Sequence, residues 1–346
     1  MGKGPLTGLA HGWARRGPWS ILLWPLARLY GALVIVRRSL YRAGVFQVHH
    51  AQLPVVIVGN LVAGGAGKTP VVVELVRYLA ARGLRPGILS RGYGRSASHC
   101  VEVMPDSAVA QVGDEPLLLR RKTGAPVFVA RSRFEAARKL RLRHPEVNVL
   151  VSDDGLQHYA LHRDVEICVF DERGVGNGWL LPAGPLREAW PRNCDIVLDS
   201  GALIAANRFA VRRRLGGFAL RSDGTALALS GLRDTAGEPG KPIWAMAGIA
   251  QPEQFFSMLR AVGIVLKGST ALADHADVLP RDLERAVGSC LLCTEKDAAK
   301  VWTLRPDALA VPLEVDIDPA FWAALEALLL ARTGTKLSLP DGYPPA

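Results

Sequence analysis

Short runs of apolar, largely β-branched residues recur along the chain, and turns or stretches with helical spacing separate them. We expect these runs to form strands at 55–58, 85–89, 147–151, 165–170 and 195–198. Apolar positions three or four residues apart predict helices over 72–79 and 117–121. Continuous apolar strands are typical of parallel sheets that are covered on both faces. The pattern therefore predicts an α/β fold with a largely parallel sheet.

The second half of the chain shows a different arrangement. Residues 218–232 alternate around Asp223-Gly224, which predicts a β-hairpin. A strand, a helix and a further strand are expected at 242–248, 252–261 and 264–266, followed by a strand in the run SCLLC and a helix at 319–330. This order predicts a second α/β unit.

The basic run 208–214 has the composition of a solvated face and marks the predicted boundary between the two domains. The chain then divides into an N-terminal segment 1–50, a first domain 51–205 and a smaller second domain 206–346.

Residues 19–36 form the most apolar stretch, about 27 Å long as a helix. The formal net charge of the chain is +10, and the first 50 residues contain no Asp or Glu but the basic residues Lys3, Arg15, Arg16, Arg28, Arg37, Arg38 and Arg42. Tryptophans and arginines beside the apolar stretch favour a helix in the membrane interface. A transmembrane helix and a soluble core helix are the alternatives. Because the excess charge belongs to one segment, we expect no nucleic-acid partner.

The five cysteines are an odd number at irregular spacing, which argues against a disulfide framework and fits a reducing compartment. Cys290 and Cys293 form a CxxC pair inside an apolar run with no second pair and no flanking histidine. We interpret them as core thiols of a strand and not as a metal or redox site.

The strongest chemical signal is a glycine-rich turn between the strand at 55–58 and the helix that follows it. Its candidate nucleotide-binding residues are Gly64, Gly65, Ala66, Gly67, Lys68, Thr69 and Pro70. Glycines let consecutive N–H groups point at phosphate oxygens, a lysine supplies charge to the β/γ-phosphates, and a threonine hydroxyl is placed to bind Mg²⁺. Val62 stands where the usual phosphate-loop pattern has a glycine, so the turn is a variant. We expect ATP or GTP as the ligand.

Acidic residues follow two other elements. Asp153 and Asp154 come at the end of the strand at 147–151, which is the form of a carboxylate pair that holds Mg²⁺; a simple turn is the alternative. Asp114 precedes a predicted helix, where an acid favours the helix dipole. Arg187 and Glu188 end a turn-rich loop and are candidates for phosphate and metal contacts.

Three further positions carry weaker signals. His158 lies a few residues beyond the acidic pair, close to the predicted metal site. Arg91 and Tyr93 belong to a turn that either touches substrate or only connects elements.

The motifs GGAGKTP, LSRGYG, GDEP, SDDGLQH, LLPAGPLRE, MAGIAQPEQFF, ADH and CTEKDAAK occur in this order. Their combination resembles the tetraacyldisaccharide 4'-kinase family of lipid A biosynthesis along nearly the whole chain. The resemblance implies transfer of the γ-phosphate of ATP, with Mg²⁺, to the 4'-hydroxyl of a tetraacyldisaccharide 1-phosphate. It also implies two α/β domains around a cleft, at the cytoplasmic face of the bacterial inner membrane, with the membrane surface as a partner and no obligate protein partner.

The same resemblance assigns roles to individual residues. It implies that Asp114 is the catalytic base, paired with His275, which replaces the helix-end interpretation of Asp114. Lys68 and Thr69 would hold the triphosphate and Mg²⁺, with Asp153 and Asp154 on the metal side. Arg187, Glu188 and His158 would line the same cleft.

Two other functions remain as alternatives. A membrane-associated P-loop ATPase acting as a nucleotide switch would share the loop, the acids and the apolar N-terminus, but would not need the ADH and TEKD turns. A soluble small-molecule kinase or synthetase would use the N-terminus as core.

Overall fold

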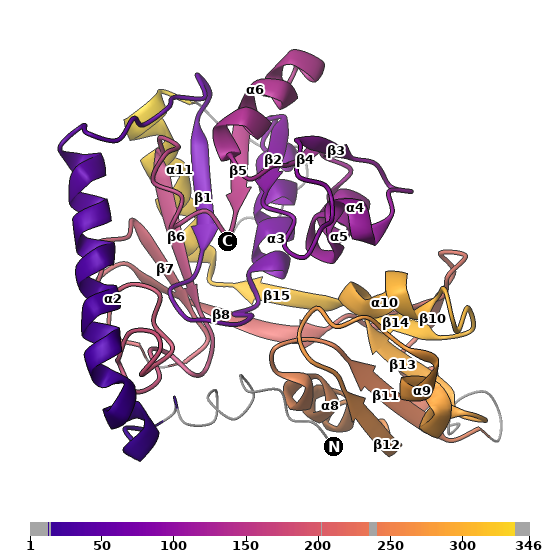
Figure 1. Ribbon diagram of the computed structural model, residues 1–346. Coiled ribbons are helices and arrows are strands. Elements are labelled where there is room, and N and C mark those ends of the chain that lie inside the picture. Colours follow the sequence, from indigo (N-terminus) through magenta and orange to yellow (C-terminus); the bar gives the residue numbers. More distant parts are fainter. Residues whose placement is uncertain (1–12, 14, 202, 235–240, 336–346) are drawn as a thin grey trace.

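The computed structural model describes residues 13, 15–201, 203–234 and 241–335, and two sheets organise it (Figure 1). The larger sheet contains β1 (Val55–Gly59), β2 (Pro86–Ser90), β3 (Val101–Val103), β4 (Val127–Val129), β5 (Val149–Asp153), β6 (Val165–Phe170), β7 (Ile196–Asp199), β8 (Arg208–Leu215) and β15 (Leu313–Ile317). Its nine strands lie in the order β15-β8-β7-β6-β1-β5-β2-β4-β3. The edge strands β3 and β15 pair antiparallel with their neighbours, and the strands between them are parallel.

Helices cover both faces of this sheet. Val56 and Val58 of β1 join one apolar cluster, whereas Val55 and Ile57 join another, because successive side chains of a strand point to opposite faces. The first cluster includes residues of α3 (Lys68–Ala81), α5 (Asp114–Thr123) and α11 (Pro319–Thr333), and the second includes residues of α6 (Arg133–Arg143). The short helix α4 (Val109–Val112) precedes α5. The predicted parallel α/β fold is confirmed.

The smaller sheet has six strands in the order β10-β9-β14-β13-β11-β12. These are β9 (Phe218–Leu220), β10 (Ala226–Ala228), β11 (Ile243–Ala247), β12 (Leu266–Ala271), β13 (Cys290–Thr294) and β14 (Leu309–Val311). Its helices are α7 (Gly231–Asp234), α8 (Pro252–Ala261), α9 (Pro280–Leu283), η1 (Glu284–Ala286) and α10 (Glu295–Val301). The hairpin at Asp223-Gly224 is confirmed, since β9 and β10 pair antiparallel around it. Cys290 and Cys293 lie in β13, as expected, and Cys293 is buried.

The basic run 208–214 is a solvated face on one side only, where Arg208, Arg212 and Arg214 are exposed. It is a strand, β8, in which Val211 and Leu215 are buried. β8 pairs with β7 in the larger sheet, and β15 returns from the smaller sheet to pair with β8. The predicted boundary at residue 206 therefore comes before β8, whereas the chain changes sheet between β8 and β9 and again between β14 and β15.

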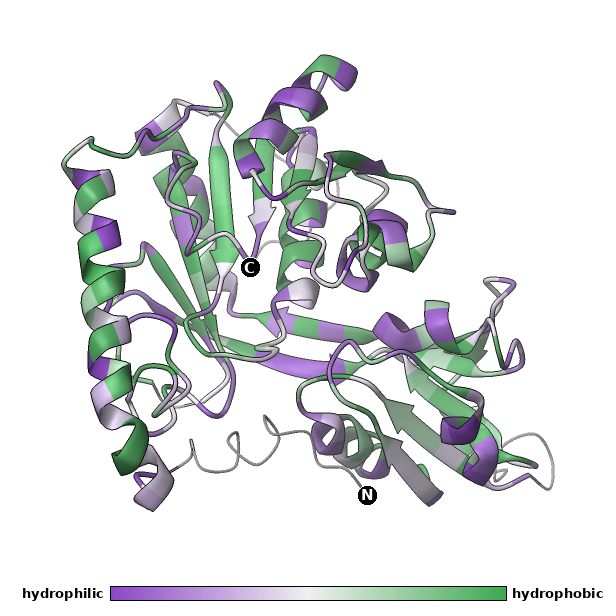
Figure 2. Ribbon diagram, viewed as in Figure 1, coloured by the Kyte–Doolittle hydropathy of each residue, from purple (hydrophilic) through white to green (hydrophobic). Residues whose placement is uncertain are grey.

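The apolar N-terminal stretch forms α2 (Pro18–Arg42), which lies along the outside of the larger sheet unit (Figures 1 and 2). Its exposed apolar side chains include Trp19, Ile21, Leu22, Leu26, Leu29, Leu33 and Ile35. Only Ser20, Ala27 and Gly31 of the helix are buried, so the interpretation as a soluble core helix is wrong. Among the described residues, α2 is the one helix long and apolar enough to cross a membrane.

The buried side of α2 docks on the loop that leads to Arg187. A Cβ atom at Gly31 would lie 2.7 Å from Leu180 Cδ1, so the small residue permits close packing. The Tyr30 hydroxyl donates to the Arg187 carbonyl oxygen over 2.9 Å. The helix is therefore tied to the loop that carries one of the predicted site residues.

Candidate active site

The predicted glycine-rich turn lies between β1 and α3, and Lys68 is the first residue of the helix. Gly64 and Gly67 have φ angles of 89° and 67°, in the left-handed region that side chains disfavour. A Cβ atom at Gly67 would also lie 2.5 Å from Arg213 Nε. Glycine is therefore favoured at this position by the backbone conformation, and a side chain there would displace the Arg213 guanidinium.

Lys68 lies in a polar network at the start of α3. Its Nζ atom donates to Asn60 Oδ1 over 3.1 Å and pairs with Asp154 Oδ1 at 3.3 Å. Arg187 Nη1 lies 3.2 Å from Asp154 Oδ2. Burial opposes ionisation of Asp154, but Lys68 and Arg187 outweigh it and lower the pKa of this carboxyl to about 2. The structure thus brings Lys68, Asp154 and Arg187 together.

Asp153 ends β5 in a buried position beside this network. Its Oδ2 atom accepts a 3.3 Å hydrogen bond from Ser90 Oγ, and Oδ1 has no hydrogen-bond partner among the described residues. Burial, reinforced by the charge of Glu115, raises the pKa of Asp153 to about 7. A buried carboxylate oxygen without a donor suits a hard cation such as Mg²⁺.

The remaining ligands of such a cation would come partly from outside the protein. No group of three or more His, Cys, Asp or Glu side chains arranged for a metal occurs within the described part of the chain. Mg²⁺ commonly keeps water and phosphate oxygens as ligands, so Asp153, Asp154 and the Thr69 hydroxyl fit it without a complete protein cage.

Asp114 and His275 meet although they lie on different sheet units. Asp114 is the first residue of α5, and His275 occupies a turn after β12 with a φ angle of 63°. His275 Nδ1 lies 3.1 Å from both Asp114 carboxylate oxygens. Burial opposes ionisation of Asp114, but His275 and two lysines hold its pKa well below the usual range. The bond to Asp114 in turn raises the pKa of His275.

Two lysines of α10 surround this pair, and the sequence analysis did not single them out. Lys300 Nζ lies 3.4 Å from Asp114 Oδ2 and donates to the His275 carbonyl oxygen over 3.1 Å. Lys296 Nζ lies 3.0 Å from both Glu115 Oε1 and Asp274 Oδ1. Their spacing of four residues in the motif TEKDAAK places both on one side of a helix, which is a signal that could have identified them.

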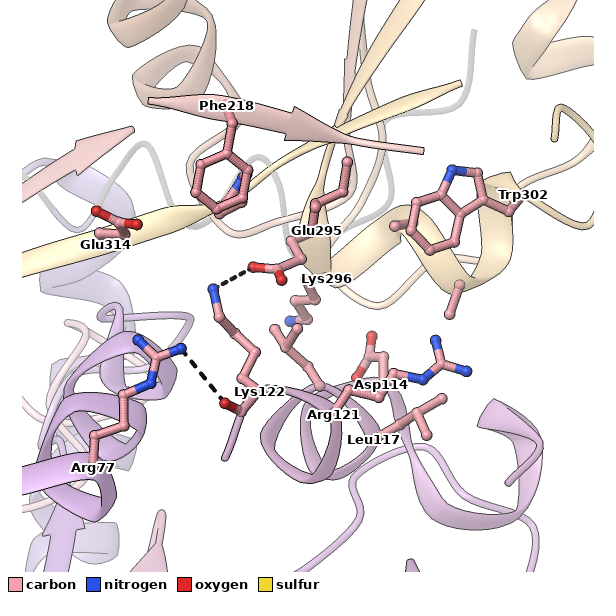
Figure 3. A pocket seen from close by; sticks show the side chains of 15 residues that line it. Arg77, Asp114, Leu117, Arg121, Lys122, Phe218, Glu295, Lys296, Trp302 and Glu314 are labelled. Atoms are coloured by element: carbon pink, nitrogen blue, oxygen red, sulfur yellow. Dashed lines mark hydrogen bonds and ion pairs between the residues drawn. The ribbon is translucent and has the colours of Figure 1, made fainter. Parts of the chain in front are cut away.

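Two neighbouring cavities extend from the loop to Asp114 and to the residues next to the Asp114–His275 pair. One, of about 130 Å³, is lined by Gly67, Lys68 and Thr69 together with Glu115, Asp274 and Lys296. The other, of about 380 Å³, is lined by Asp114 and shares Lys122, Glu295 and Lys296 with the first (Figure 3). We regard the smaller one as the nucleotide site, because it contains the loop. Figure 3 shows the 2.6 Å ion pair of Lys122 with Glu295, residues that line both cavities.

Other predicted residues lie around the site with different contacts. Glu188 is buried and accepts a 2.5 Å hydrogen bond from the Tyr159 hydroxyl, so its predicted role at the metal stays a prediction. His158 Nε2 accepts from Arg133 N over 3.3 Å, and burial lowers the pKa of His158 to about 4. The Tyr93 ring lies 5.2 Å from that of His275, so the SRGYG turn reaches the candidate catalytic pair.

Two arginines bond carbonyl oxygens of the phosphate loop, and the sequence analysis missed both. Arg173 Nη2 donates to the Gly65 carbonyl oxygen over 3.0 Å. Arg213 Nη2 donates to the Ala66 carbonyl oxygen over 2.6 Å, although its run was expected to be a solvated face. The signal for Arg213 was weak. Arg213 lies on the same face of β8 as Val211 and Leu215, but three consecutive arginines hide the alternation of the strand.

Comparison with known proteins gives a consistent result. The family model described as tetraacyldisaccharide-1-P 4'-kinase matches residues 19–330. A tetraacyldisaccharide 4'-kinase of Verminephrobacter eiseniae is 50% identical, with 96% of this chain and 81% of the relative covered. The protein of that name from Acidovorax sp. (strain JS42) is 51% identical, with 94% and 96% covered. The crystal structure of the "apo" form of LpxK from Aquifex aeolicus in complex with ATP is similar, with a TM-score of 0.74, 26% identity, and coverage of 90% of this chain and 98% of that chain.

Proposed function

The chain belongs to the tetraacyldisaccharide 4'-kinase family, and from this membership we propose how its own residues carry out the reaction. The enzyme transfers the γ-phosphate of ATP to the 4'-hydroxyl of a tetraacyldisaccharide 1-phosphate in lipid A biosynthesis. The product is the 1,4'-bisphosphate. The residue roles, the metal and the membrane contact that follow are our proposals.

The observation that carries the proposed mechanism is the contact of Asp114 with His275 beside the loop of Lys68. We assign Asp114 as the base that accepts the proton of the attacking hydroxyl and His275 as the residue that orients it. Because the pKa of Asp114 is low, this carboxylate is ionised at neutral pH but binds a proton weakly. Phosphoryl transfer depends mainly on alignment and charge, so a weak, well-oriented base suffices.

The phosphate loop would bind the phosphate donor, ATP, opposite Asp114. The N–H groups of the loop and the Lys68 ammonium would bind the β- and γ-phosphates, and Arg187 would add a second positive charge. Lys68 is already desolvated, with a side chain 10% exposed, which strengthens its attraction to an anion. Its present partner Asp154 would turn to Mg²⁺ when ATP binds.

Thr69, Asp153 and Asp154 are the residues that would hold Mg²⁺. The unpaired Oδ1 atom of Asp153 supports this assignment. When bound, the ion neutralises charge on the phosphates and fixes their orientation.

We further propose that α2 lies on the cytoplasmic face of the bacterial inner membrane. Its exposed apolar side chains and the basic residues Arg28, Arg37, Arg38 and Arg42 support contact with an anionic bilayer. The acyl chains of the acceptor would then stay in the lipid while its sugars reach the cleft. The bond between Tyr30 and the Arg187 carbonyl supports a fixed distance between membrane and site.

A test of the assigned roles compares two enzymes, the wild-type chain and Asp114→Asn. Each is assayed with two acceptors, one with a free 4'-hydroxyl and its 4'-deoxy analogue. The wild type should label only the first acceptor. Asp114→Asn should lower kcat by about 10²- to 10⁴-fold, the usual contribution of general base catalysis, with little change in the Kd for ATP. Label on the 4'-deoxy analogue would contradict the assigned hydroxyl. An equal loss of ATP binding in Asp114→Asn would make Asp114 a structural acid.

A further inference from the structure

The phosphate loop is held by hydrogen bonds on the side that faces away from its N–H groups. Arg173 Nη2 and Arg213 Nη2 donate to the carbonyl oxygens of Gly65 and Ala66. In a planar trans peptide the carbonyl oxygen and the following N–H point in opposite directions. These two bonds therefore fix where the N–H groups of Ala66 and Gly67 point.

A glutamine at the N-terminus of α8 bonds Arg213 directly, and a second one bonds the carboxylate that holds Arg173. Gln254 Oε1 accepts a 3.0 Å hydrogen bond from Arg213 Nη1. Gln251 Nε2 donates over 2.7 Å to Asp171 Oδ2, and the same carboxylate oxygen lies 2.6 Å from Arg173 Nη2.

Arg213, Gln251 and Gln254 line the cavity of about 130 Å³ that contains the loop, and the acid behind Arg173 is buried. Asp171 is 2% exposed, and burial lowers the pKa of Arg213. A Cβ atom at Gly65 would lie 3.2 Å from Ala250 Cβ, so the residues before α8 also touch the loop directly. Hydrogen bonds in a site of this kind are stronger than in water and polarise their neighbours, which makes the loop N–H groups better donors.

We propose that Gln251 and Gln254 are positioning residues for the nucleotide. They hold Arg173 and Arg213 on the carbonyl side of the loop, and the loop N–H groups are thereby aimed at the phosphates. Because α8 packs on the smaller sheet and the loop belongs to the larger one, ATP affinity depends on the position of the two sheet units relative to each other. The inference rests on the proposed function of the loop as the phosphate site of ATP.

The test measures the Kd for ATP by equilibrium titration without acceptor. Gln254→Leu keeps the size of the side chain but removes its bonds, and should weaken ATP binding about tenfold, near the loss of one charge-assisted hydrogen bond. Gln254→Glu keeps an oxygen for Arg213 but loses the Nε2 donor that bonds Glu172 Oε1 over 3.2 Å, so it should weaken ATP binding less than Gln254→Leu does. Glu253→Ala is the matched control, since this neighbouring side chain is 75% exposed and pairs with Arg260 at 4.0 Å. Gln251→Leu provides a second arm, through Asp171, and should also weaken binding.

Kinetics give an independent readout. The glutamine to leucine variants should raise the KM for ATP and leave the KM for the lipid acceptor unchanged. Equal Kd values for Gln254→Leu and Gln254→Glu, whether both normal or both impaired, would overturn the inference. If the wild-type chain failed to bind ATP, the proposed function would be wrong as well. If the wild type binds ATP but Gln254→Leu and Gln254→Glu have equal Kd values, only the positioning role is wrong.

Discussion

Lys68 is held between Asn60 and Asp154, so its charge is in place before any nucleotide arrives. Lys68→Ala should lower kcat by on the order of 10²- to 10³-fold, because charge developing on the transferred phosphoryl group loses a fixed partner. Steady-state turnover at saturating ATP measures the effect. Lys139→Ala is a suitable control, since that exposed side chain pairs only at 3.4 Å with Glu135 on α6. Full activity of Lys68→Ala would remove the loop lysine from the mechanism.

The bond between His275 and Asp114 predicts a pH-dependent contribution to stability. Because the folded-state pKa of His275 is raised above 6.5, the stabilisation is fully present below pH 6.5 and is lost as pH rises through the folded value. His275→Ala should therefore reduce the free energy of unfolding more at pH 6 than at pH 9. Urea titrations at the two values measure this difference.

The matched control for that experiment is His158→Ala. Burial lowers the pKa of His158 to about 4, so the folded imidazole is neutral at both pH values while the unfolded one is largely protonated at pH 6; removing it should therefore cost less at pH 6 than at pH 9, the opposite of His275→Ala. An equal cost of His275→Ala at pH 6 and pH 9 would contradict the charged pair.

The site residues differ in how far the sequence could predict them. The loop of Lys68 is contiguous in the chain, so its pattern is readable directly. Asp114 and His275 are 161 residues apart, and only resemblance to a family linked them. Arg173 and Arg213 bind backbone carbonyl groups, which carry no sequence signal, and for that reason they were found only in the structure.

At the scale of elements, α2 gives the clearest prediction. Replacing Leu22, Leu29 and Leu33 together by glutamine removes three exposed apolar side chains, which are 67%, 60% and 61% exposed. Binding to vesicles with anionic lipid should fall at least about 10²-fold, because each leucine contributes at least about 1 kcal/mol when it enters the interface. Cosedimentation measures the loss. The control is Leu142→Gln, 76% exposed on α6, and unchanged binding of the triple variant would place the membrane contact elsewhere.

Strands covered on both faces were predictable, since β1, β5 and β6 are continuous apolar runs. β8 was not, because its arginines are satisfied by partners that appear only on folding, such as Glu314 and Asp316 beside Arg214. The charged helix α6 was also missed. It buries little besides Ala136, Ala137 and Leu140, and so has a weak apolar stripe.

At the scale of the whole molecule, the smaller sheet is inserted between β8 and β15 of the larger one. A hydrophobic pattern predicts elements but not their partners, so the pairing of Val315 with Arg213 could not be anticipated. This topology places α8, α10 and the turn of His275 opposite the loop of Lys68. Both units are thereby required to build one site.

The most direct measurement of the central claim follows the γ-phosphate of labelled ATP in a reaction with Mg²⁺ and a tetraacyldisaccharide 1-phosphate in detergent. We expect one labelled phosphate on the 4'-hydroxyl of the lipid for each ATP consumed, and a rate of label transfer by Lys68→Ala that is lower by on the order of 10²- to 10³-fold. ATP consumption that releases inorganic phosphate and leaves the lipid unlabelled would contradict the account and favour a nucleotide switch.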